Sequence, residues 1–406
     1  MLPKLRTDLQ FIPASTEDGT PVMVIQDPLG LMEKALILPQ ASLLILQVME
    51  KSSSIEEVQE QLIRLQDGVF ISKETIQNLI DELDQSYLLN TEKYQQALQA
   101  IVDEFAQKSL RLPYCAGSSY PEDKEEVEKF LDQILHSTPK LELPETDSAP
   151  PLALVSPHID LRVGGKAYAA AYHSIRDFEP QLVVILGVGH QMLEGYFCLT
   201  QKEFQTPLGT TPVAKDLVER LLRPGFSALT PHDFYHKQEH SIEFQVLFLQ
   251  YIYSHSFEIL PILVGSFHRE LADHSRPQEI PGVGDFLGHL KELLASYPKD
   301  SVLLLAGVDL SHVGLKFGDG QSAHAILPEA EEHDKAFLEY LCQNNLAELW
   351  KHVQKVEDKF HLCGFHALSC LLELLPSSTR GTLLHYEIWR EEPTQSAVSY
   401  ASVLFT

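Results

Sequence analysis

Short apolar runs that alternate with helical patterns constrain the fold of this chain most. The runs "PLALVSPH", "QLVVILGVGH", "FEILPILVGSF" and "SVLLLAGVDLSH" are continuous and rich in Leu, Ile and Val. Such runs are typical of strands that are buried on both faces. The segments "GKAYAAAYHSI", "TPVAKDLVERLL", "SIEFQVLFLQYIY" and "VGDFLGHLKELLASY" have helical periodicity and lie among them. The alternation predicts an α/β domain with a mostly parallel sheet flanked by helices.

A different pattern precedes this core and predicts a small second domain. The stretch "IPASTEDGTPVMVIQDPLG" alternates apolar residues with turn formers, which indicates an irregular arm or a β-hairpin. Three short amphipathic helices follow from Pro39, and Ser54 is the expected N-cap of the second. Their order is similar in pattern to a winged-helix or PqqD-like unit.

The domain boundary is predicted where a further helix, "EKYQQALQAIVDEFAQKSL", leads out of the first domain. We expect a mainly α winged-helix-like domain over residues 1–110 and the α/β domain over residues 111–406. The polar, proline-bearing stretch "HSTPKLELPETDSAPP" is interpreted as a linker or surface loop before the apolar runs.

The charge balance limits the partners of the chain. The sequence has 57 acidic and 31 basic residues and a formal charge of −26 at pH 7, which repels phosphate backbones and anionic lipid surfaces. The third helix of the first domain carries Lys73 as its single cation among several carboxylates. This favours peptide docking or plain packing over DNA binding, and we expect no nucleic-acid partner.

Cysteine usage and hydropathy indicate the compartment. The five cysteines are widely spaced and odd in number, which fits a reducing cytosol better than a disulfide framework. The first residues have no signal-peptide core, and no apolar run approaches the length of a membrane span. We therefore expect a soluble cytoplasmic protein with no membrane contact.

Titratable residues follow three of the apolar runs at the point where each predicted strand ends. They are His158, His190 and the pair Asp309 and His312. The carboxyl ends of parallel strands meet at one edge of a sheet, where ligands bind, so these side chains are expected to converge. A single histidine in such a place more often has a structural role. Titratable residues at the ends of three strands together indicate a functional site.

The stretch "HKQEHSIEFQ" adds polar residues at the start of a predicted helix. His236 and His240 are four residues apart and would face one metal ion, although the spacing differs from HExxH. Glu239 and Glu243 are also one turn apart. They are either acidic residues that complement the helix dipole or residues with a second-shell or substrate-binding role.

Cys363 comes just before Gly364 and a predicted helix in "HLCGFHALSCLLELL". There the helix dipole would lower the pKa of the thiol, and Cys363 would ligate a metal or act as a nucleophile. The alternative is a small buried hydrophobic residue. Cys370, within "ALSCLLELL", is expected in the core.

A series of motifs now carries a family resemblance. In order they are "YCAGSSYPED", "SPHIDLRVGGKAYAAAY", "VVILGVGHQM", "FQTPLGTTPVAKDL", "QEHSIEFQVLFL", "PILVGSF", "VDLSHVG", "HLCGFHAL" and "SAVSYAS". The series, from about residue 114 to the end, resembles the Memo family, also described as protein B of the AmmeMemoRadiSam system.

The resemblance implies a fold similar to the class III extradiol (LigB-type) dioxygenases, which use nonhaem Fe(II). It implies a metal-binding set of His158, His190 and Cys363, and it matches Asp309 and His312 to other polar residues of the pocket. It also implies AMMECR1-like and radical-SAM companion proteins.

One motif departs from the family pattern. Many members have a PHAGY-type sequence where this chain has "PHIDLR". Asp160 and Arg162 therefore belong to a different substrate shell, and Glu239 and Glu243 are assigned to substrate binding beside them.

The donor set leaves the metal open. Two imidazoles and one thiolate suit Fe(II), Cu or Zn, and the resemblance favours Fe(II). His312, held by Asp309, is the expected general acid or base, with His240 as a further candidate catalytic residue.

These expectations favour a metal-dependent, dioxygenase-like redox enzyme that acts on a small molecule or a modified peptide. The alternatives are a non-catalytic binding scaffold that uses the same pocket, a zinc-dependent hydrolase, and a winged-helix regulator with a sensor domain.

Overall fold

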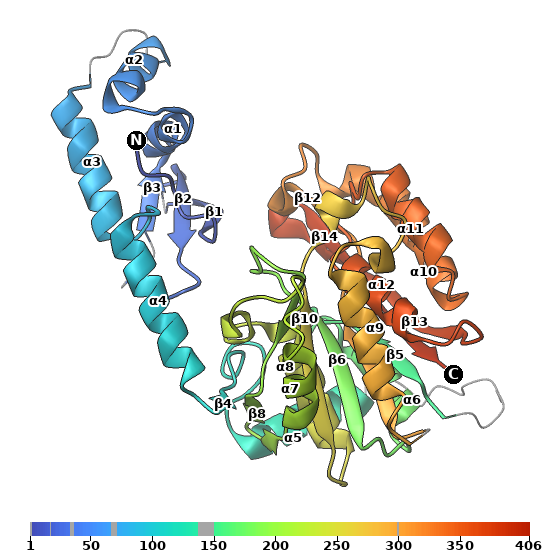
Figure 1. The fold of residues 1–406 in the computed structure, drawn as a ribbon. Coiled ribbons are helices and arrows are strands. Elements are labelled where there is room, and N and C mark those ends of the chain that lie inside the picture. The colour runs from blue at the N-terminus through green and yellow to red at the C-terminus, as the bar shows by residue number, and fades with distance from the viewer. Residues whose placement is uncertain (1, 17, 33–35, 66–70, 137–149, 299) are drawn as a thin grey trace. The chain divides into compact units, whose positions relative to one another are not determined.

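A computed structural model describes residues 2–16, 18–32, 36–65, 71–136, 150–298 and 300–406 (Figure 1). Contacts within the chain divide it into two units, Met1–Gln107 and Lys108–Thr406. The predicted boundary was placed after residue 110. The predicted linker falls mostly on residues 137–149, which lie outside the described residues.

The first unit combines a small sheet with helices. Strands β1 (Gln10–Ser15), β2 (Pro21–Gln26) and β3 (Leu36–Pro39) form an antiparallel sheet in that order, and the helices are α1 (Gln40–Lys51), α2 (Ile55–Leu65), α3 (Lys73–Gln85) and α4 (Glu92–Ala106). The predicted hairpin and all four predicted helices are present. Ser54 Oγ accepts the main-chain N–H of Glu57 at 3.2 Å, as expected of an N-cap.

Strand β3 is an addition that the sequence analysis did not predict, so the unit is less purely helical than expected. Its four residues are too few to show a clear alternation. The likeness to a winged helix stays a prediction.

The second unit is built on a mixed sheet. Its strand order is β12-β14-β5-β11-β6-β10-β7, and β13 pairs with β14. The strands are β5 (Ala153–Ser156), β6 (Leu182–Val188), β7 (Phe197–Leu199), β10 (Glu258–Val264), β11 (Val302–Gly307), β12 (His312–Gly314), β13 (Gly381–Glu391) and β14 (Ser396–Phe405). The four predicted strands, β5, β11, β6 and β10, are parallel and adjacent, and the antiparallel strands extend the sheet on both sides. The predicted α/β fold class is confirmed.

Helices cover both faces of this sheet (Figure 1). Helices α6 (Gly165–Ile175) and α8 (His240–Ile252) pack on one face and α5 (Lys124–His136) packs on them. Helix α12 (Phe365–Leu374) packs on β6 and β11 from the other face, with α9 (Val283–Leu294) and α11 (Leu346–Lys355) beside it and α10 (Ala323–Cys342) next to α11. The remaining helix is α7 (Lys215–Leu222), and a small sheet is formed by β4 (Leu110–Arg111), β8 (Glu203–Thr206) and β9 (Gly209–Thr211).

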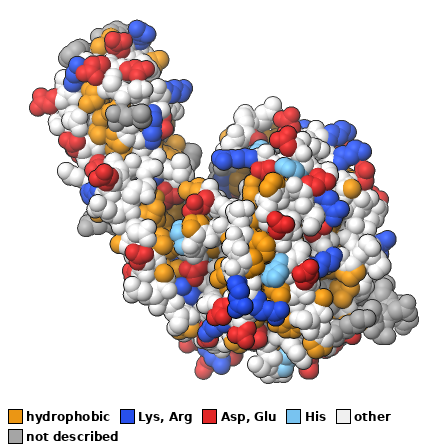
Figure 2. Space-filling view, viewed as in Figure 1, with side chains coloured by type: hydrophobic (Ala, Val, Ile, Leu, Met, Phe, Trp, Pro, Cys, Tyr) orange, Lys and Arg blue, Asp and Glu red, His pale blue; other side chains and the backbone are white. Residues whose placement is uncertain are grey.

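The surface is mixed in charge. On the face drawn in Figure 2, acidic and basic side chains are interspersed, with apolar side chains between them. Within the described ranges, every helix is too short or too polar to cross a membrane.

Two paired glycines let α8 approach the sheet closely. Gly187 of β6 and Gly307 of β11 are register partners. A Cβ atom on Gly307 would lie 2.5 Å from the main-chain oxygen of Ser241, and one on Gly187 would lie 2.6 Å from Ser241 Oγ. Side chains at these two positions would push the helix away. The glycines thus bring the first turn of α8, with His240, to the carboxyl ends of the strands.

We predict that Gly307→Ala destabilises the second unit by about 1–3 kcal/mol, because its new methyl group would overlap the main chain of α8. The control is Gly288→Ala in α9, where a Cβ atom meets nothing within 4 Å. Removing this helical glycine should stabilise the protein by about 0.5–1 kcal/mol.

Urea unfolding followed by tryptophan fluorescence measures both effects. Both tryptophans, Trp350 and Trp389, belong to the second unit, so the signal reports on that unit. Equal free energies of unfolding for the two variants would contradict the close packing of α8 on the sheet.

Candidate metal centre

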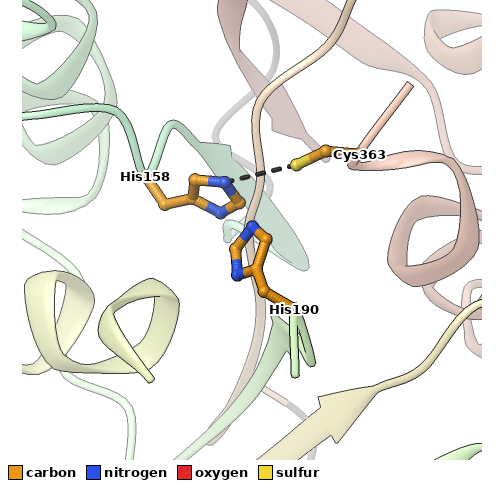
Figure 3. Close-up of side chains that lie close together, drawn as sticks. All are labelled: His158, His190 and Cys363. Atoms are coloured by element: carbon orange, nitrogen blue, oxygen red, sulfur yellow. Dashed lines mark hydrogen bonds between the residues drawn. The ribbon is translucent and has the colours of Figure 1, made fainter. Parts of the chain in front are cut away.

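His158 lies directly after β5 and is buried, with 3% of its surface exposed. Its Nδ1 atom is 2.9 Å from the carbonyl oxygen of Gly307. A carbonyl only accepts, so Nδ1 carries the proton and donates, and Nε2 keeps its lone pair. That Nε2 atom lies 3.2 Å from the Sγ atom of Cys363 (Figure 3). The main chain of β11 therefore fixes His158 in the tautomer that a metal ligand needs.

His190 lies after β6, which β11 separates from β5 in the sheet. Its side chain lies in the same cluster as that of His158. Its Nδ1 atom is 3.0 Å from Oε2 of Glu239, while 36% of its side chain is exposed. The buried carboxylate of Glu239 accepts from Nδ1, so Nε2 is the nitrogen that would bind a metal ion after losing its proton. In Figure 3 the two imidazoles and the thiol are turned toward one another.

Cys363 is held by the main chain that follows β11. Its N–H donates to the carbonyl of Leu310 at 3.2 Å, and the N–H of Gly364 donates to the carbonyl of Asp309 at 3.0 Å. A Cβ atom on Gly364 would lie 2.5 Å from that Asp309 oxygen, so a larger residue does not fit there. The loop before α12 is thus docked on the end of β11, with the thiol beside His158.

These three residues bring their donor atoms together. One atom each of His158, His190 and Cys363 lies within 4.8 Å of the others. With metal–nitrogen bonds of about 2.0–2.1 Å and metal–sulfur bonds of about 2.3 Å, donors on one ion are roughly 3–3.6 Å apart. The 3.2 Å between His158 Nε2 and Cys363 Sγ already lies in that range. The donor set and its fixed tautomers fit a metal ion.

The surroundings shift the pKa values of the two imidazoles in opposite directions. Burial, and then the nearby rings of His190 and His240, hold the pKa of His158 well below its usual value. Burial also opposes the charged form of His190, but the Glu239 carboxylate and the Cys363 thiol outweigh it and raise the pKa of His190 well above normal. The metal-free site therefore holds a neutral His158 and a protonated His190 against Glu239.

The predicted lowering of the pKa of Cys363 is wrong. Burial raises the pKa of this thiol, and the neighbouring His190 only partly offsets the effect. The cost of burying a thiolate outweighs the helix dipole that the sequence position suggested. A bound metal ion would lower the pKa of this thiol and favour the thiolate.

Asp309 and His312 both follow β11, and His312 is the first residue of β12, but Asp309 does not orient His312 as predicted. Oδ1 of Asp309 accepts the main-chain N–H groups of His158 and Ile159 at 3.0 and 3.2 Å, and Oδ2 lies 3.6 Å from His158 Nε2. His312 instead places Nδ1 3.0 Å from the carbonyl of Leu310. A backbone carbonyl, which sequence patterns do not reveal, fixes its tautomer.

Burial moves the pKa values of these two groups in opposite directions. It raises the pKa of Asp309 to about 7 and lowers the pKa of His312 to about 4. Near neutral pH, His312 is therefore neutral and Asp309 is close to its midpoint of protonation.

His240 joins the cluster, whereas His236 does not. The centroid of the His240 ring is 5.1 Å from those of His158 and His190, and its Nδ1 atom is 3.3 Å from Oε1 of Glu239. The expectation that His236 and His240 share a metal is wrong, because α8 begins only at His240. His236 lies in a preceding 3-10 turn, with Nε2 3.0 Å from the carbonyl of Cys198.

Glu239 orients a candidate metal ligand, which is one of the two roles that the sequence left open for it. It is the N-cap of α8, accepts the N–H of Ser241 at 2.9 Å, and contacts both His190 and His240 through its two oxygens. The nearby imidazoles lower its pKa although burial opposes this. Its contact with His240 is local, whereas His190 comes from a segment distant in sequence, after β6, and the local pattern could not show that contact.

The other three predicted substrate contacts do not join the cluster. Glu243 is fully buried, and its oxygens accept from Arg111 and from the N–H groups of Tyr114 and Cys115. The predicted substrate contact of Glu243 is therefore left without support.

Asp160 and Arg162 lie in the turn before α6. Asp160 Oδ1 accepts the N–H of Arg162 at 2.9 Å, and the Arg162 side chain donates to the carbonyl of Ser118 and lies over the ring of Phe130. Their predicted substrate contacts stay predictions.

Comparison with known proteins gives a consistent result. A family model described as Memo-like protein matches residues 111–404. A MEMO1 family protein of Aquifex aeolicus is 29% identical over 389 residues, covering 94% of this chain and 95% of that protein. A MEMO1 family protein of Thermus thermophilus is 29% identical over 361 residues, covering 86% and 98%. One of Methanobrevibacter smithii is 30% identical over 309 residues, covering 73% of this chain and 99% of that protein.

Among solved structures, an uncharacterized protein of Escherichia coli K12 is 16% identical and covers 63% of this chain and 99% of its own, with a TM-score of 0.37. That score carries no conclusion about the fold. The family model, in contrast, spans nearly all of the second unit, including His158, His190 and Cys363. The chain belongs to the Memo-like protein family.

Proposed function

We propose that this protein is a metal-dependent redox enzyme, similar to nonhaem-iron dioxygenases, that acts on a small molecule or a modified peptide. Fe(II) is the leading metal and copper is the alternative. One observation carries the proposal. The donor atoms of His158, His190 and Cys363 come within 4.8 Å of one another from three separate segments, and the Nδ1 atom of each imidazole is engaged by an acceptor, so Nε2 is the nitrogen left for a metal ion.

A bound iron or copper ion would supply one-electron chemistry and a Lewis acid. His158 Nε2, His190 Nε2 and Cys363 Sγ would hold it, and three protein donors leave positions for other ligands. Gly307 and Glu239 would keep the two imidazoles oriented. The five cysteines are all free, which fits a reducing compartment such as the cytoplasm.

The proton chemistry is assigned to residues beside the donors. His312 is neutral near pH 7 and donates Nδ1–H to Leu310, so its Nε2 atom is free to accept a proton from a substrate. Asp309, with a pKa of about 7, is suited to donate a separate proton of its own. His240 is the further candidate, since Glu239 holds its ring beside His158 and His190. Partnership with AMMECR1-like and radical-SAM proteins is part of the proposal and rests on the family resemblance alone.

The proposed metal site leads to a prediction about metal retention. Protein purified without oxygen should retain close to one metal ion per chain, and His158→Ala or Cys363→Ser should lose most of it, because each removes one of three donors. Elemental analysis by mass spectrometry measures the content. Cys342→Ser is the matched control, since Cys342 ends α10 outside the cluster. Full occupancy in the His158→Ala/Cys363→Ser double variant would refute the metal site.

The identity and activity of the retained metal separate the alternatives. Iron or copper with metal-dependent oxygen uptake on a panel of phenolic, small-molecule and modified-peptide substrates supports the redox enzyme. Retained zinc with ester or amide hydrolysis would point to a hydrolase instead. Retained metal without turnover on either panel would favour a binding scaffold.

A further prediction concerns pH. The pKa values of His190 and Cys363 are both raised, so the metal-free site holds protons on these groups at neutral pH. A metal ion must displace these protons, so its affinity should rise as the pH rises and fall as the pH falls. Calorimetric titration in buffers of different ionisation enthalpy should show net proton release. In Cys363→Ser the release should be smaller. Binding without proton release in the wild type would contradict this description of the site.

A further inference from the structure

Arg111 is a fully buried cation that binds the main chain just before α8. Its Nε atom donates to the carbonyl of His236 at 2.9 Å, and Nη2 donates to the carbonyl of Glu239 at 2.7 Å. Nη1 donates to the carbonyl of Leu112 at 3.1 Å and pairs with the carboxylate of Glu243. One planar guanidinium thus spans the turn that leads into the helix and the first turn of the helix itself.

Glu243 connects Arg111 to Tyr114, Cys115 and Tyr120. Its carboxylate accepts the N–H groups of Tyr114 and Cys115 at 2.9 and 2.8 Å and the hydroxyl of Tyr120. Breaking one partner of a buried ion pair is costly, because the other charge is left uncompensated. Arg111 and Glu243 together, hereafter the Arg111 clamp, therefore fix the start of α8 against residues 111–120.

We propose that the Arg111 clamp is a positioning element for the metal ligand His190, and that it acts through Glu239. Arg111 holds the main-chain carbonyl of Glu239, and the side chain of the same residue accepts from His190 Nδ1. Moving that carbonyl moves the carboxylate and with it the direction of His190 Nε2. The metal part of this inference rests on the proposed function.

The chemistry of arginine matters for this role. The guanidinium donates in several fixed directions in one plane, and here it serves acceptors on His236, Glu239, Leu112 and Glu243. A lysine ammonium keeps the charge but has no planar fork, so it cannot reproduce this geometry. Arg111 lies in β4, near the start of the second unit. One side chain near the start of the second unit therefore helps to set the orientation of His190.

The test is a double-variant cycle on the full chain. Arg111→Lys should keep the circular dichroism spectrum and weaken Fe(II) or Co(II) binding about 10-fold, the range reported for loss of an outer partner of a metal ligand. Glu239→Gln should weaken binding by a similar factor or more. Because Arg111 acts through Glu239, Arg111→Lys should cause little further loss in the Glu239→Gln background. A merely structural role would give additive losses.

Arg6→Lys is the matched control. Arg6 is also buried and pairs with two carboxylates, Asp8 and Asp27, but it lies in the first unit. Its replacement should leave metal affinity unchanged. If Arg111→Lys alone does not fold, the Arg111→Gln/Glu243→Gln pair buries no unpaired charge and allows the same comparison.

A second measurement separates this inference from the proposed function. In metal-free protein labelled with ¹⁵N-histidine, the Nδ1 proton of His190 against Glu239 should be seen in the wild type and in Arg6→Lys, and lost in folded Arg111→Lys. A wild type that binds no metal would defeat the proposed function, while the proton signal still decides the clamp. Retention of that signal in folded Arg111→Lys, or metal affinity equal to the wild type, would overturn the clamp.

Discussion

The main chain at the end of β11 is the constraint on which the candidate site depends. The carbonyl of Gly307 fixes the tautomer of His158, and the carboxylate of Asp309 binds the main chain of the same histidine. The carbonyls of Asp309 and Leu310 receive the N–H groups of Gly364 and Cys363. One short segment thus places two donors that are far apart in sequence, mostly through backbone groups whose geometry side-chain rotation does not change.

The third donor depends on a second, separate support. Glu239 orients His190, and the start of α8, which carries Glu239, is seated on Gly187 and Gly307 and held by Arg111. Gly307 serves both supports, since its carbonyl faces His158 and its missing side chain admits α8. The two halves of the site are therefore coupled through adjacent strands.

Much of the fold was predictable because burial on both faces leaves a strong pattern. The runs that became β5, β6, β10 and β11 are continuous and apolar, and the helices between them repeat with helical period. Eight strands were not predicted: β3, β4, β7, β8, β9, β12, β13 and β14. Most of them have four residues or fewer, and β13 has a mixed burial pattern. Strand β14 is long and buried, but serines interrupt its apolar run.

For the site, the sequence by itself determined which residues stand at the strand ends. Parallel strands must present His158, His190, Asp309 and His312 at one edge, and the Memo resemblance added Cys363. Only the tertiary structure decided their partners: Leu310 rather than Asp309 for His312, Glu239 for His190, and Arg111 rather than a substrate for Glu243. The tertiary structure also set the raised pKa of Cys363. The physical reason is that hydrogen-bond partners and desolvation depend on contacts between segments distant in sequence, about which local pattern carries no information.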